Sequence, residues 1–201
     1  MILIKLLLRI IFLIIAVAAA VLCLHVDVNI MNNGLSETSL TEVVQESILL
    51  LIVVIHFIRA RKSSVQRQCN VLIAGFFLAM LIRELDGVFD LIHHGSWVWF
   101  ALLSSIVSIG YVLRTPSLVA KQLADYARTP SYGLMVAGLA TVLIFSRLFG
   151  MSVLWHDILQ EGYVRVVKNM VEEGVELFGY ILCLAATVNL LHVKQPDEEG
   201  K

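Results

Sequence analysis

The chain has 201 residues, of which 59% are hydrophobic and 15% are charged, and its formal net charge is −1. Soluble domains average about 45–50% apolar and about 25% charged residues, so this composition excludes an ordinary soluble domain and indicates a polytopic membrane protein. No basic patch supports a nucleic-acid partner, and the three widely spaced cysteines do not form a disulfide framework or a zinc knuckle.

The first 24 residues carry Lys5 and Arg9 ahead of a long apolar run. This pattern predicts an uncleaved first membrane span. A cleaved signal peptide is the alternative, because residues 16–18 (Ala-Val-Ala) resemble a small-residue cleavage site. A polar loop without Lys or Arg is expected over residues 28–41.

Five further apolar segments follow, each long enough to cross a hydrocarbon core of about 30 Å. They cover residues 42–58, 71–92, 97–113, 133–155 and 163–193. Between the fourth and fifth spans, Pro116 marks a helix start, and apolar residues at helical spacing predict a short helix on the membrane surface that ends before Pro130. The fold class is therefore an all-α bundle of six transmembrane helices in a single domain, residues 1–193, followed by a charged tail, residues 194–201.

The basic residues define the orientation by the positive-inside rule. With the amino terminus in the cytoplasm, the outer side keeps only Arg165 and Lys168, while Arg83 and Arg147 lie within the bilayer. All other lysines and arginines fall on the inner side, so both termini are predicted to be cytoplasmic, in the multi-pass topology of a cell-membrane protein. In a Gram-negative cell this would be the inner membrane.

The third span closes with ionisable residues where a membrane helix should be apolar. At about 100° per residue, five of them share an arc of roughly 100°, with Glu84 outside it; the five are Arg83, Asp86, Asp90, His93 and His94. The predicted topology brings other acids and histidines to the same outer side, namely Glu46, His156, Asp157, Glu161, Glu172, Glu173 and Glu176.

Unpaired charge in the bilayer costs about 2.5–3.5 kcal/mol or more, so these groups need partners. At 1.5 Å per residue, Arg83 and Arg147 both lie about 6 Å outward of the midpoints of their spans. The sequence therefore predicts structural ion pairs in which Arg83 and Arg147 neutralise Asp86, Glu84 or Glu176.

The remaining groups favour a metal site. His93 and His94 follow Asp90 by about one helical turn, as Glu176 follows Glu172 and Glu173. Helical bundles that hold two metals use such sets on facing helices, and mixed histidine–carboxylate ligation suits zinc, iron or manganese. We predict a divalent-metal site with Asp86, Asp90, His93, His94 and Glu172 as ligands.

A metal in a funnel near the headgroups could activate water, with Glu173 and Glu176 as catalytic carboxylates. The first functional hypothesis is therefore a metal-dependent intramembrane hydrolase acting on a lipid-like substrate. Glu46, His156, Asp157 and Glu161 are secondary candidates for the site. The alternatives are an ion, proton or metal transporter, and a non-catalytic subunit that assembles with itself or with a membrane partner.

Overall fold

The computed structural model describes residues 2–31 and 39–191 of the chain. Every regular element in those residues is helical, without a strand, which confirms the predicted all-α class. The predicted tail, residues 194–201, and residues 32–38 of the predicted loop lie outside the described residues.

The chain divides into two compact units. Unit 1 comprises Met1–Gln45 and Val136–Ala185, and unit 2 comprises Glu46–Met135 and Ala186–Lys201. The single domain over residues 1–193 stays a prediction.

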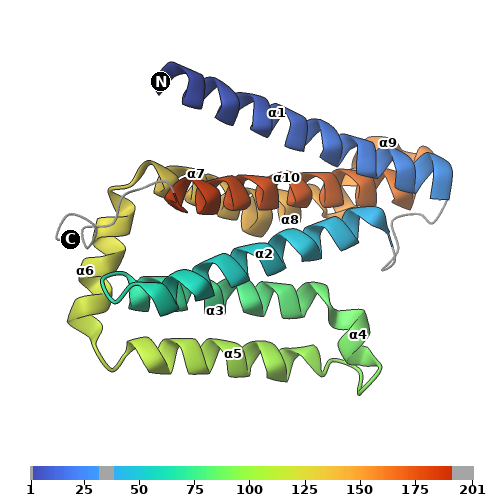
Figure 1. The fold of residues 1–201 in the computed structure, drawn as a ribbon. Helices are drawn as coiled ribbons and strands as arrows, with labels where there is room; N and C mark the ends of the chain where they lie inside the picture. Colours follow the sequence, from blue (N-terminus) through green and yellow to red (C-terminus); the bar gives the residue numbers. More distant parts are fainter. Residues whose placement is uncertain (1, 32–38, 192–201) are drawn as a thin grey trace. The chain divides into compact units, whose positions relative to one another are not determined.

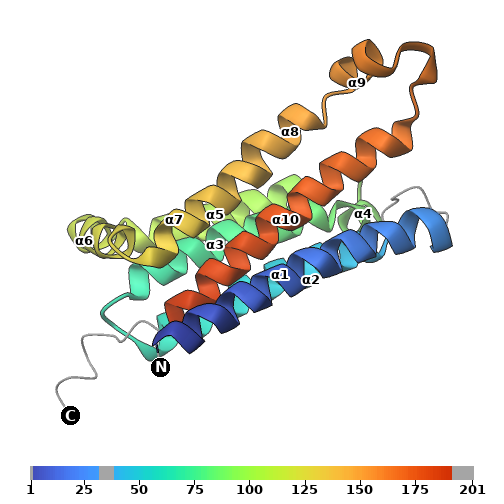
Figure 2. The ribbon, with the colours of Figure 1, turned by 90° about the horizontal axis from the view of Figure 1, so that it is seen from above.

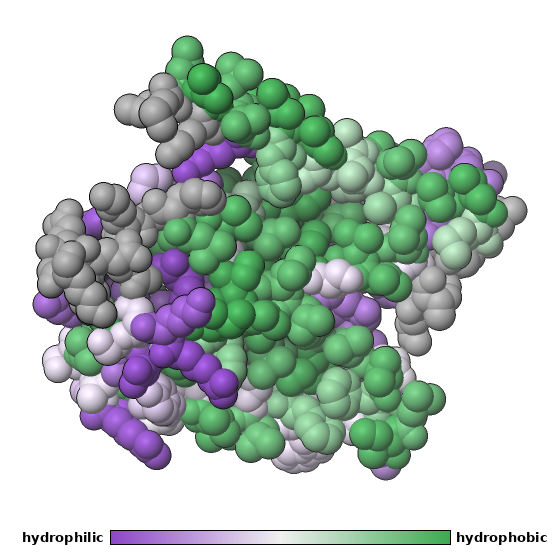
Figure 3. Space-filling model, viewed as in Figure 1, coloured by the Kyte–Doolittle hydropathy of each residue, from purple (hydrophilic) through white to green (hydrophobic). Residues whose placement is uncertain are grey.

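Unit 1 is built from long helices and their connections. It contains α1 (Ile2–Val26), a π-helical turn (Asp27–Met31), a second π-helical turn (Thr141–Phe145), α8 (Ser146–Phe149), α9 (Ser152–Leu159), a 3-10 turn (Gln160–Gly162) and most of α10 (Arg165–Leu191). The helical run that ends in α8 lies alongside α10 in both views, and α9 lies in the connection between them (Figures 1 and 2). Most of the described side chains of α1 are hydrophobic, and many of them are exposed, as expected where lipid is the solvent (Figure 3).

Two glycines allow the helical run before α8 to approach α10 closely. A Cβ added to Gly138 would lie 2.6 Å from Cys183 Sγ and 2.8 Å from the Gly179 carbonyl oxygen. Small residues at such crossings let helix backbones pack directly in a membrane, where lipid removes the hydrophobic drive for association.

We expect Gly138→Ala to lower the free energy of unfolding by about 1–3 kcal/mol, because the Gly179 backbone cannot move as a flexible side chain would. The matched control is Gly133→Ala, since a Cβ there meets nothing within 4 Å. Denaturant titration in mixed micelles measures both variants. Equal stability of the two variants would show that the close approach contributes nothing.

Unit 2 contains most of α2 (Leu40–Lys62), then α3 (Arg67–Glu84), α4 (Asp86–Asp90), α5 (Trp97–Val112), α6 (Pro116–Ala127) and the start of α7 (Pro130–Ala140). Helices α3 and α5 run antiparallel and pack along their lengths (Figure 1). Ser108 occupies the space that a side chain at Gly75 would need, and Ser104 Oγ donates to the Gly75 carbonyl at 3.3 Å.

The short helix predicted between the fourth and fifth spans is present as α6, with Pro116 as its first residue, and it makes an angle of 102° with α5. Its position on the membrane surface stays a prediction. Hydrophilic side chains gather over α6 and over the connection between α2 and α3 (Figure 3). α5 ends at Val112, and the sharp bend follows at Thr115, whose φ of −139° lies outside the helical region directly before Pro116 starts a new helix.

Two predicted spans were too long. The third was expected to continue to residue 92, but α3 ends at Glu84 because Leu85 has a ψ of 22°, and the separate α4 ends at Asp90. The fifth was expected to reach residue 155, but α8 ends before Gly150, and the extended Met151, with a ψ of 118°, precedes the separate α9. Residues that precede and follow such a break do not share one continuous helical face.

Among the described residues, four helices are long and apolar enough to cross a membrane, or five if the bent pair of α5 and α6 is one span. The four are Leu7–Met31, Leu40–Lys62, Pro130–Phe149 and Arg165–Leu191. The chain therefore has the helices of a membrane protein. The predicted number of six is not confirmed.

Candidate functional site

The predicted metal ligands of unit 2 lie in and after α4, on exposed turns. His94 Nδ1 lies 2.7 Å from Asp90 Oδ2, and the Gly95 backbone N–H donates to Asp90 Oδ1 at 2.8 Å. These hydrogen bonds, from Gly95 first and then from His94, hold the pKa of the Asp90 carboxyl below its usual value. The His94 side chain is 95% exposed, so this arrangement closes a surface turn.

The other predicted residues of unit 2 are distributed along α2, α3 and α4. The Arg83 guanidinium contacts the Glu84 carboxylate, its neighbour in sequence. Asp86 is exposed, Glu46 is half-buried in α2, and the exposed His93 ring contacts the His94 carbonyl through Nδ1 at 2.8 Å. The stripe expected from a continuous helix is therefore interrupted at Leu85.

Unit 1 holds a cluster of charged side chains between α8 and α10. Arg147 donates to Glu176 at 2.5 Å and to Glu172 at 3.2 Å. Lys168 Nζ also donates to Glu172, at 2.7 Å, and Ser146 Oγ donates to Glu176 at 3.2 Å. Two cations therefore neutralise two carboxylates that are 15% and 3% exposed.

Close backbone approach makes room for this cluster. A Cβ at Gly150 would collide with the Glu172 carboxylate, so glycine is the residue that lets Glu172 approach Arg147. Glu173 is engaged separately, because Gln45 Nε2 donates to both its carboxylate and its carbonyl at 3.1 Å. The predicted catalytic carboxylates, Glu173 and Glu176, thus both accept hydrogen bonds from side chains of the protein.

The secondary candidates of unit 1 are peripheral. His156, Asp157 and Glu161 are all exposed. His156 bonds to the Ser152 carbonyl within its own helix, and its ring stacks on Tyr163 with 3.7 Å between centroids.

In residues 2–31 and 39–191, no three His, Cys, Asp or Glu side chains are grouped so that they could hold a metal ion. The predicted ligands fall in unit 2 (Asp86, Asp90, His93 and His94) and in unit 1 (Glu172). Their convergence on one pocket stays a prediction.

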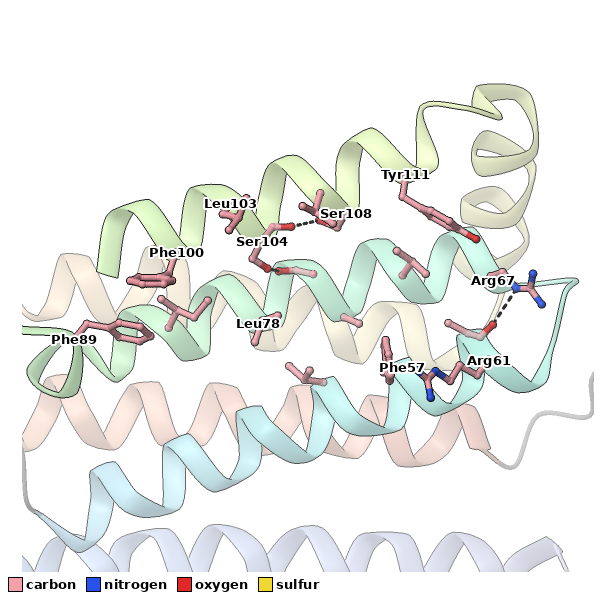
Figure 4. A pocket seen from close by; sticks show the side chains of 17 residues that line it. Phe57, Arg61, Arg67, Leu78, Phe89, Phe100, Leu103, Ser104, Ser108 and Tyr111 are labelled. Atoms are coloured by element: carbon pink, nitrogen blue, oxygen red, sulfur yellow. Dashed lines mark hydrogen bonds between the residues drawn. The ribbon is translucent and has the colours of Figure 1, made fainter. Parts of the chain in front are cut away.

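Unit 2 also contains an elongated apolar groove of about 800 Å³ along α2, α3 and α5 (Figure 4). Its walls are almost entirely hydrophobic, with residues such as Val71, Leu78, Ile82, Leu103 and Val107. Pockets of about 300–1,000 Å³ with apolar walls and few polar groups are typical of small-molecule sites.

The two ends of the groove differ in chemistry. At one end, the Phe89 and Phe100 rings pack with 4.9 Å between centroids. At the other, Arg61 and Arg67 lie where α2 turns into α3, and Tyr111 extends toward them from the end of α5 (Figure 4). The groove thus has an apolar end and a cationic end, which fits an elongated amphipathic ligand.

No protein-family model, curated protein or solved structure matches this chain. Its function must be argued from its own geometry, and the groove is the feature with the shape and chemistry of a binding site.

Sequence reasoning missed a buried polar network in unit 2. The His56 side chain is fully buried, with Nδ1 2.8 Å from Asn70 Oδ1 and Nε2 3.3 Å from Thr187 Oγ1. Arg59 donates to the Leu190 carbonyl at 3.1 Å, which satisfies a group in the last turn of α10. Polar residues at helical spacing along α2 were the available signal, but their partners lie far away in sequence.

Proposed function

We propose that this chain is a multi-pass membrane protein that binds a membrane lipid, with an acyl chain in the groove of unit 2. The single observation that carries the proposal is an apolar groove that has cationic side chains at one end only. Walls of this kind offer few hydrogen bonds to a polar ligand, whereas an acyl chain can move from the bilayer into them without exposing apolar surface to water.

The length of the groove fits an acyl chain of a membrane lipid. Along α5 the groove extends from Phe100 to Tyr111, which is about 16 Å at 1.5 Å per residue. One leaflet contributes about half of the ~30 Å hydrocarbon core. A lipid with its headgroup beside Arg61 and Arg67 would therefore lie in the groove over the depth of one leaflet.

The topology proposed with this function has six spans, both termini in the cytoplasm and α6 on the inner surface. It is supported by the distribution of lysine and arginine, because the helix ends and connections assigned to the cytoplasm hold Arg59, Arg61, Lys62, Arg67 and Arg114. The lipid would then belong to the cytoplasmic leaflet of the cell membrane. The 102° angle between α5 and α6 is what a span followed by a surface helix requires.

The groove supports only part of the functional hypotheses drawn from the sequence. A lipid-like ligand is common to this proposal and to the metal-dependent hydrolase, but the metal and the hydrolysis stay predictions. Transport and assembly with a partner also stay predictions. The charged cluster of unit 1 has the pairing expected of a structural element, since its carboxylates are matched by Arg147 and Lys168.

Filling the groove should displace the lipid. Leu103 lines the groove and adjacent Leu102 does not, although both are exposed on α5. With phospholipids that carry a photoreactive acyl chain, we expect Leu103→Trp to reduce labelling of the groove peptides severalfold, because the indole ring fills the space of the acyl chain and removes its van der Waals contacts with the walls. Leu102→Trp should leave labelling unchanged. Mass spectrometry of the labelled peptides, from protein in nanodiscs, measures both.

Two results would contradict the proposal. One is labelling of the groove that does not exceed that of the Ile106 face of α5, which is exposed but does not line the groove. The other is equal labelling in Leu103→Trp and Leu102→Trp.

A further inference from the structure

We infer that the cationic end of the groove selects a phospholipid with an anionic headgroup, through its phosphate, over a zwitterionic one. The inference rests on the proposed function and specifies the class of lipid.

Both arginines are oriented by neighbours that leave their charge available. The Arg61 guanidinium lies 4.5 Å from the centroid of the Phe57 ring, a cation–π contact that holds the side chain on the groove wall. Arg67 donates to the Ala60 carbonyl through Nε at 3.1 Å, which fixes the plane of its guanidinium (Figure 4). Its two terminal nitrogens take no part in that hydrogen bond.

The charge at this end is uncompensated by the groove itself. No aspartate or glutamate lines the groove, and within the described residues neither Arg61 nor Arg67 forms an ion pair with a carboxylate. Nearby Arg59 contrasts with them, because it is buried and bonded to the Leu190 carbonyl and to Gln66. The fold therefore uses one arginine internally and presents the other two, exposed, at the groove.

Planar guanidinium groups match the oxygens of a phosphate and can bind it with two parallel hydrogen bonds. Tyr111, which closes the same end, points its hydroxyl toward the arginines, where it can donate to a further phosphate or glycerol oxygen (Figure 4). Tyrosine at the membrane interface commonly has an apolar ring and a polar tip in this way. A zwitterionic headgroup would bring its own cation to a site that already has two.

The test uses the full-length protein in nanodiscs with two photoreactive phospholipids that have the same acyl chains, one with a phosphoglycerol headgroup and one with a phosphocholine headgroup. Each basic residue near a membrane surface favours an anionic lipid about fivefold. We expect the phosphoglycerol probe to label the groove more strongly. The double variant R61Q/R67Q should reduce this preference roughly twentyfold or more, to near parity.

Arg114→Gln is the matched control, because Arg114 is an exposed arginine assigned to the same side of the membrane that does not line the groove. The inference is overturned if the preference for phosphoglycerol survives R61Q/R67Q, or if R114Q lowers it equally. Equal labelling by both probes in the unmodified protein also overturns it. In that case sensitivity to Leu103→Trp shows that the acyl-chain site stands, whereas insensitivity shows that the proposed function fails as well.

Discussion

Replacing Arg147 by glutamine should destabilise the protein by about 3 kcal/mol, because it leaves Glu176 buried without its cation. The Glu176 side chain is 3% exposed, and the loss of Arg147 leaves it with the Ser146 hydroxyl among its bonding partners. Glu172 is less affected, since Lys168 remains bound to it. The measurement is the free energy of unfolding by denaturant titration in mixed micelles.

The double variant Arg147→Gln/Glu176→Gln separates the penalty of an unpaired charge from a general loss of packing. If the penalty is electrostatic, the double variant recovers most of the lost stability, because two neutral amides can bond to each other. Arg165→Gln, an exposed arginine at the start of α10, should change stability by no more than about 0.5 kcal/mol. A double variant as unstable as Arg147→Gln alone would show that the ion pair is not the cause.

Asp27→Ala should be the second large effect, with a loss of about 2–4 kcal/mol. Asp27 is fully buried in the π-helical turn after α1 and accepts hydrogen bonds at the start of α2. Its oxygens bond to the Leu40 backbone N–H at 2.7 Å and to the Thr41 backbone N–H and hydroxyl at 2.8 and 2.6 Å. Alanine would remove the acceptor of all three donors at the helix N-terminus, and the two donors of Thr41 are buried.

Asp27→Asn should lose less than Asp27→Ala, because one amide oxygen can still accept from the helix while the amide nitrogen cannot. Asp157→Ala is the control, since that carboxylate is exposed. Thermal unfolding in detergent ranks the three variants. A loss in Asp27→Ala no larger than that in Asp157→Ala would show that the carboxylate does not hold α1 to α2.

The presence of the long helices follows from hydrophobicity alone, because a run of about 20 apolar residues has one stable structure in a bilayer. The expected depth of charged side chains in the membrane was also informative. Arg147 and Glu176 were expected at similar depths, and they are in contact in the structure. The presence of the helices and the approximate depth of these side chains both follow from local sequence, because depth is counted along each helix at a nearly constant rise per residue.

The sequence was less informative where chain geometry depends on single residues. The stripe from Arg83 to His94 assumed a continuous helix, which a single ψ of 22° at Leu85 interrupts. The capping role of Asp27 could not be predicted, because its partner Leu40 lies 13 residues further along the chain. Hydrogen bonds between residues on either side of a loop follow no periodic sequence pattern, so they cannot be predicted from the sequence.

The groove was equally inaccessible from sequence. It is lined by residues of three helices, α2, α3 and α5, and the close packing of α3 against α5 depends on the fit of Gly75 against Ser108. Arg61 and Arg67 were used in the sequence analysis only as markers of the cytoplasmic side. Only the three-dimensional structure shows that both arginines also lie at one end of the apolar groove.

The π-helical turn at Thr141–Phe145, directly before Ser146 and Arg147, has an evolutionary consequence. A turn of this kind accommodates one more residue than an α-helix over the same stretch, as a single-codon insertion would produce. Deletion of that residue would rotate the helix that follows, α8, by about 100° about its axis. The Arg147 guanidinium would then point away from Glu176. A homologue with an unbroken α-helix here would therefore need its arginine at a neighbouring position, so alignments of such sequences should show a gap and a displaced arginine together.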